Sequence, residues 1–108
     1  MTKLEQARIN IDDIDTKIIE LFEKRMDTVK DVIKFKIENN IPILDSNRET
    51  IMLEKNLNKI SNEEYKKYYK DVLEGYLKAS KEMQKDILDK NNVNTIISFL
   101  IYLFAFLC

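Results

Sequence analysis

Several residue types that carry chemistry or form turns are absent or nearly absent from this chain. Its 108 residues include no histidine and only one cysteine, one glycine and one proline. Without histidine, Ser-His-Asp and Cys-His catalysis are excluded, and no metal site of the zinc type is expected. The lone cysteine, Cys108, excludes an internal disulfide and fits a reducing compartment. With so little glycine and proline for the turns of a multistranded sheet, the composition predicts an all-α protein.

The charge balance excludes further function classes. The chain has 18 lysines and arginines against 19 acidic residues, which gives a net charge of −1. No nucleic-acid partner is expected, because proteins of that class present an excess of positive charge to the phosphate backbone. The N-terminal stretch MTKLEQARIN is polar and lacks the apolar segment of a secretory signal, so we expect a cytoplasmic protein.

Residues 4–38 contain no glycine or proline and predict one very long N-terminal helix. A stripe of residues recurs along this helix in steps of three and four, which is the helical period: Leu4, Arg8, Ile11, Ile14, Ile18, Leu21, Phe22, Arg25, Val29, Val32 and Lys36. Three members of this otherwise apolar stripe, Arg8, Arg25 and Lys36, are cations. Surface charges normally avoid such a stripe, and arginine binds a carboxylate through two parallel hydrogen bonds. We therefore interpret the three cations as ligand contacts.

A break is predicted at residues 39–42, because Pro42 forces the residue before it out of the helical region. Ser46 followed by Glu49 has the pattern of a capping box, which predicts a second helix over residues 47–60. The inward-facing residues of that helix are expected to be Leu53, Leu57 and Ile60.

A second capping-box pattern at residues 61–64 predicts a third helix over residues 63–88. Its inward stripe is mainly aromatic and aliphatic, but Ser80 and Gln84 interrupt it near the end. Gly75 weakens the helix by about 1 kcal/mol relative to alanine, and one interpretation is that it marks a close contact between helices.

The chain changes character after residue 90. Residues 91–94, with the sequence NNVN, are expected to end the third helix, and residues 96–108 carry no charge. Those last residues would span only ~20 Å as a helix, which is too short for a hydrocarbon core of ~30 Å and argues against a membrane anchor. We expect a helical domain over residues 1–90 and an apolar tail over residues 91–108. The tail either packs as an added helix on the bundle or on a dimer partner, or is not part of the functional unit.

The length of the first helix predicts a dimer. About 35 residues give a helix of ~52 Å, whereas a domain of this size is roughly 35 Å across. A second copy related by a two-fold axis is the commonest way to cover the overhanging stripe. If two copies pair antiparallel about residue 20 or 21, residue 8 of one lies opposite residues 32–34 of the other, between Arg25 and Lys36. The fold class expected is therefore a three-helix all-α protomer in an intertwined two-fold dimer.

The other helices add polar groups to this cluster of cations. Arg48 and Glu49 begin the second helix, where free backbone N–H groups favour anions, and Asp45 comes just before it. Ser80 and Gln84 add a hydroxyl and an amide. Such a site offers no activated nucleophile, and it suits a small dianion that carries hydroxyl groups. Catalysis by orientation and electrostatic stabilisation fits it better than covalent chemistry.

At these residues the chain resembles the all-helical chorismate mutases over about residues 4–88. The resemblance is carried by the stretches ARINIDDIDTKIIELFEKR, VIKFK, IPILDSNRE and ASKEMQ, with these positions in register: Arg8, Arg25, Lys36, Asp45, Arg48, Glu49, Ser80 and Gln84. The apolar tail is a departure from the short members of that family. The resemblance implies a homodimer that converts chorismate to prephenate in phenylalanine and tyrosine biosynthesis, without a cofactor.

The resemblance also implies roles for these residues. Arg25, and Arg8 from the partner chain, would bind the two substrate carboxylates, with Arg48 in support. Lys36 and Gln84 would donate to the ether oxygen of the breaking bond. Glu49 and Asp45 would accept a hydrogen bond from the ring hydroxyl of the substrate. Ser80 would line the end of the site that binds the carboxylates.

Other interpretations remain open from the sequence. An isochorismate pyruvate-lyase has the same fold and nearly the same cations, although the Asp45 and Glu49 pair favours the mutase. A non-catalytic helical dimer would explain the stripe but not its cations, and a decayed enzyme would keep the site beside a damaging tail. Asp45 could be a turn residue only, Glu49 only a helix cap, and Ser80 only a small residue that allows close packing.

Overall fold

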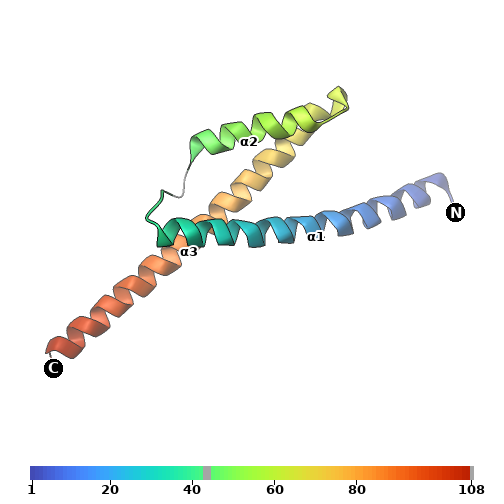
Figure 1. The fold of residues 1–108 in the computed structure, drawn as a ribbon. Coiled ribbons are helices and arrows are strands. Elements are labelled where there is room, and N and C mark those ends of the chain that lie inside the picture. Colours follow the sequence, from blue (N-terminus) through green and yellow to red (C-terminus); the bar gives the residue numbers. More distant parts are fainter. Residues whose placement is uncertain (43–44, 108) are drawn as a thin grey trace. The chain divides into compact units, whose positions relative to one another are not determined.

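The computed structural model describes residues 1–42 and 45–107, without the side chains of residues 92–99, 102, 106 and 107. Its elements are α1 (Lys3–Glu38), α2 (Ser46–Lys59), the short 3₁₀ helix η1 (Glu63–Tyr65) and α3 (Lys66–Leu107), all shown in Figure 1. No strand occurs among the described residues, so the predicted all-α class is confirmed. Cys108 lies outside the described residues.

Helix α1 has a defined hydrogen-bonded cap at each end. At the start, the Glu5 N–H donates to Thr2 Oγ1 at 3.1 Å and the Thr2 N–H donates to Glu5 Oε2 at 3.2 Å, which makes a capping box that the sequence analysis missed. At the end, Asn40 has a φ of 54° and the Ile41 N–H donates to the carbonyl of Lys36 at 2.8 Å. This is a Schellman ending, and it confirms the predicted break before Pro42.

The apolar stripe of α1 is largely open to solvent in the single chain. Residues Met1–Ile41 form a structural unit of their own, and α1 makes up nearly all of it. Ile11 and Ile14 are each 54% exposed, and Leu21 is 65% exposed. A single helix cannot bury its own stripe, so this surface needs a partner if it is to leave water.

The second unit, Pro42–Cys108, contains α2 packed against α3. Asp45, rather than the expected Ser46, caps α2, because its carboxylate accepts a hydrogen bond from the Arg48 N–H at 3.0 Å. The Glu49 N–H, which a Ser46 capping box would use, instead donates to the backbone carbonyl of Asp45 at 3.2 Å, so the helix begins one residue earlier than expected. Met52 is the buried residue of α2, while the predicted inward residues are partly buried: Leu53, Leu57 and Ile60.

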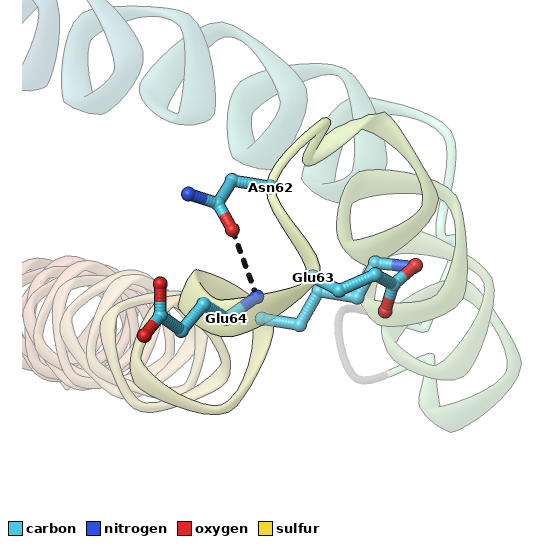
Figure 2. Close-up of polar contacts among 4 residues, drawn as sticks. Asn62, Glu63 and Glu64 are labelled. Atoms are coloured by element: carbon cyan, nitrogen blue, oxygen red, sulfur yellow. Dashed lines mark hydrogen bonds and ion pairs between the residues drawn. The ribbon is translucent and has the colours of Figure 1, made fainter.

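The connection between α2 and α3 also differs from the prediction of a capping box at residues 61–64. The side-chain oxygen of Asn62 accepts a hydrogen bond from the Glu64 N–H at 3.0 Å, as Figure 2 shows. This bond spans two residues and begins the 3₁₀ turn η1, so the α-helix starts only at Lys66. An ion pair of 2.7 Å between Glu63 and Lys66 joins the turn to the first residue of α3.

Helix α3 continues to Leu107, so the expected break at residues 91–94 is wrong. Asparagine is a poor helix former, but it keeps its backbone N–H and costs less than 1 kcal/mol per residue, unlike proline. The helix buries Leu73 and Ser80, at 2% and 6% exposure. Beyond Gly75, its chain neighbours and the adjacent turns of helix backbone, no described atom would lie within 4 Å of a Cβ at this position, which does not support the close contact suggested for it.

The apolar end of α3 is exposed where its side chains are described. Leu100, Ile101 and Phe104 are all more than half exposed. Within the described residues, no helix combines the length and the apolar character required to span a membrane.

Candidate active site

The candidate site residues come from both units, and each group has its own geometry. Helix α1 carries Arg8, Arg25 and Lys36 on one stripe. At about 1.5 Å per residue, Arg8 is ~25 Å from Arg25 and ~42 Å from Lys36 along the helix axis. Within one chain, Arg8 therefore cannot share a small ligand with either of the other two cations.

Lys36 occupies a special position on α1. It lies in the last turn, and its carbonyl receives the Ile41 N–H that closes the helix. A cation here is favoured by the negative end of the helix dipole. The Schellman ending closes the turn of backbone that carries the Lys36 side chain.

The second unit brings the other candidates together at the start of α2 and along α3. Asp45 is the N-cap of α2, and Arg48 and Glu49 stand in its first turn. Asp45 and Arg48 are exposed, whereas Glu49 is partly buried. The Arg48 N–H already donates to the Asp45 carboxylate, so the Arg48 guanidinium is the cationic group that this helix end offers to an anion.

Helix α3 contributes a buried hydroxyl and a partly buried amide. Ser80 is 6% exposed, and Gln84 lies one turn further along the helix and is partly buried. The expectation that these two polar residues interrupt an inward stripe is confirmed by their burial. Both side chains can donate a hydrogen bond to a ligand and neither carries a charge.

One contact within this group was missed by the sequence analysis. The Lys81 ammonium forms an ion pair of 2.9 Å with the Glu49 carboxylate, which joins α3 to the first turn of α2. Lysine is abundant in the chain, so Lys81 did not stand out by type. The sequence feature that could have identified Lys81 is its position between the two candidate residues Ser80 and Gln84.

The candidate residues of each unit include groups that can bind an anion, but neither set contains an evident group for covalent catalysis. The candidate set consists of cations, carboxylates, one hydroxyl and one amide. Among the residues that the structure describes, no group of three or more histidine, cysteine, aspartate or glutamate side chains is placed to hold a metal ion. The chemistry available is hydrogen bonding and electrostatic stabilisation.

Comparison with known proteins agrees with this chemistry. The bifunctional chorismate mutase/prephenate dehydratase of Buchnera aphidicola subsp. Schizaphis graminum (strain Sg) is 46% identical over 57 residues, which are 51% of this chain and 15% of that protein. The chain thus matches only a small part of that relative's length. The family model for chorismate mutase type II matches residues 7–85, a range that contains all eight candidate residues from Arg8 to Gln84. The resemblance seen in the sequence is therefore confirmed, and the chain belongs to the chorismate mutase type II family.

Proposed function

We propose that this chain is an isomerase that rearranges chorismate to prephenate in the biosynthesis of phenylalanine and tyrosine. The observation that carries the proposal is the family match over residues 7–85, which includes every candidate site residue. The name of the Buchnera relative includes the same activity. The chemistry of the site residues is in keeping with this assignment, because the reaction needs a bound dianion and no nucleophile.

The rearrangement is a concerted shift within one molecule. The enolpyruvyl side chain folds over the ring, a carbon–carbon bond forms, and the carbon–oxygen bond of the ether breaks. No proton is removed and no cofactor takes part. Negative charge grows on the ether oxygen as its bond breaks, so donors placed at that atom bind the transition state more tightly than the substrate and raise the rate.

In this proposal two residues act on the ether oxygen and the others hold the substrate. The Lys36 ammonium and the Gln84 amide donate to the oxygen. Arg25 and the partner's Arg8 bind the two carboxylates, and Arg48 supports them. Glu49 and Asp45 accept a hydrogen bond from the ring hydroxyl. Ser80 lines the end of the site that binds the carboxylates.

The proposal includes a homodimer that forms around α1. It is supported by the exposure of the α1 stripe, including Ile14 at 54% and Ile18 at 46%. Antiparallel pairing of two α1 helices about their midpoint would bring Arg8 of one copy between Arg25 and Lys36 of the other. A stable folded monomer at micromolar concentration in sedimentation experiments would contradict this part of the proposal.

The proposed activity is tested by following chorismate spectrophotometrically and identifying the product. We expect chorismate to disappear and prephenate to accumulate in equal amount. Isochorismate should be supplied in a parallel reaction, because release of pyruvate from it alone would identify the lyase that shares this fold. An unchanged concentration of both compounds, with a folded protein, would support a non-catalytic dimer or a decayed enzyme instead.

A further inference from the structure

The contact between Lys81 and Glu49 suggests a role that none of the candidate residues fills. Its nitrogen and oxygen atoms are 2.9 Å apart, and it connects α3 to the first turn of α2. The Glu49 side chain is 26% exposed and the Lys81 side chain is 47% exposed. An ion pair this accessible to water adds little to stability, typically less than ~1 kcal/mol. We therefore consider its effect on the direction of the Glu49 carboxylate.

A glutamate carboxylate needs a fixed direction if it is to accept a hydrogen bond from a ligand. The free side chain rotates about three bonds, and this freedom is lost when a ligand binds. If a cation already holds the carboxylate in place, the side chain has less conformational freedom to lose when the ligand binds. The carboxylate has two oxygens with several acceptor positions, so it can keep Lys81 as a partner and still accept from a ligand hydroxyl.

The position of Lys81 on α3 suits this role. Ser80, the residue before it, is buried at 6% exposure, and Gln84, three residues after it, is partly buried. Residues three apart on a helix lie on the same side, so the stem of Lys81 leaves α3 beside Gln84. Its ammonium then reaches Glu49 at the start of α2, where the candidate ligands of the second unit gather.

We propose that Lys81 is a positioning residue, which holds the Glu49 carboxylate in the direction needed to accept the ring hydroxyl of the substrate. The proposal rests on the proposed function. Lys81 acts through Glu49 and contacts neither the substrate nor the breaking bond. Its loss therefore weakens binding of the substrate and leaves the rate of the chemical step nearly unchanged.

The test is a double-mutant cycle measured by steady-state kinetics with chorismate. In the wild-type background, Lys81→Met should raise KM by roughly two- to tenfold, with kcat changed by less than about twofold. In the Glu49→Gln background, the same substitution should have no further effect, because the carboxylate that Lys81 positions is gone. Lys81→Arg should restore KM, since an arginine can keep the ion pair.

Lys78→Met is the matched control. It removes one positive charge from an exposed position on the same helix, so any general effect of net charge on a dianionic substrate appears in both variants. Helix content and thermal unfolding of all variants should match those of the wild type.

The outcomes separate this inference from the proposed function. If the wild type does not convert chorismate, both fail together. If the wild type is active and Lys81→Met has an unchanged or lower KM, only the role of Lys81 is wrong. The role of Lys81 is also wrong if Lys81→Met raises KM equally in the wild-type and Glu49→Gln backgrounds. The same holds if Lys78→Met and Lys81→Met change KM equally.

Discussion

The backbone carbonyl of Lys36 accepts a hydrogen bond from the Ile41 N–H at 2.8 Å, across the end of α1. The helix ends between them because Asn40 adopts a left-handed conformation with a φ of 54°, and the Asn40 N–H donates to the carbonyl of Ile37 at 3.3 Å. Asparagine and glycine tolerate this conformation, whereas other residues pay a steric penalty in it. The ending of α1 that follows the proposed ether-oxygen donor thus depends on a left-handed residue four positions after it.

Substitution of Asn40 should show this dependence. Asn40→Val places a β-branched residue in the left-handed region and should lower the free energy of unfolding by about 1–2 kcal/mol. Asn40→Gly should leave stability within about 0.5 kcal/mol of the wild type, because glycine adopts the same conformation freely. Urea unfolding measures both. Equal stabilities of the two variants would show that the ending of α1 does not depend on Asn40.

Asp45 offers a test of whether one carboxylate serves both the fold and the ligand. Its Oδ1 accepts from the Arg48 N–H at 3.0 Å and caps α2. Asp45→Ala should lose the cap and about 1 kcal/mol of stability. Asp45→Asn keeps a capping oxygen but replaces the other acceptor with a donor, so stability should hold while KM for chorismate rises about fivefold. An unchanged KM in Asp45→Asn would mean that Asp45 acts only as a cap.

The sequence predicted the bounds of α1 and α2 to within one residue, and strong local signals lie where α1 ends and where α2 begins. Pro42 and the preceding asparagines end α1, and a cluster of capping residues begins α2. The end of α3 was predicted 19 residues too early, at residue 88 instead of Leu107. Three asparagines weaken a helix without blocking it, so a pattern of poor helix formers does not determine where a helix stops.

The sequence indicated which residues belong to the candidate site, but not which of their side chains contact one another. Ser80 and Gln84 could be found from the sequence because polar residues break an apolar stripe there, and both are buried or partly buried. The Lys81–Glu49 pair could not be found in the same way, since lysine is common on every helix. Which of many lysines meets a given carboxylate depends on how α2 packs against α3, and that packing is not a local property of the sequence.

Lys36 provides a test of electrostatic catalysis. Lys36→Ala should lower kcat by ~10²–10³-fold, as loss of one donor to a developing negative charge does in other enzymes, with a smaller change in KM. The reason is that the charge on the ether oxygen appears only in the transition state. Steady-state kinetics with chorismate measures both constants. A large rise in KM with kcat unchanged would show that Lys36 binds the substrate instead.

Gln84 tests the second donor through pH. In Gln84→Glu, a neutral carboxyl can still donate to the ether oxygen, whereas an ionised one repels the charge that grows there. The ordinary pKa of a glutamate carboxyl is about 4.3, and a bound dianion moves it upward. The activity of this variant relative to the wild type should therefore be highest at acid pH and fall as pH rises. Parallel profiles from about pH 4.5 to about pH 8.5 would contradict a contact between Gln84 and that oxygen.

The central claim, an electrostatic active site shared by two chains, is tested most directly by mixing two inactive variants. Homodimers of Arg8→Ala and of Lys36→Ala should each have very little chorismate mutase activity, because both of their sites are damaged. When the two are refolded together, each heterodimer should have one doubly damaged site and one intact site. We expect each heterodimer to recover about half of the wild-type activity, since one of its two equivalent sites is complete. Heterodimers that form, as shown by a tag on one chain, but recover no activity would contradict the assignment of Arg8 to the partner's site.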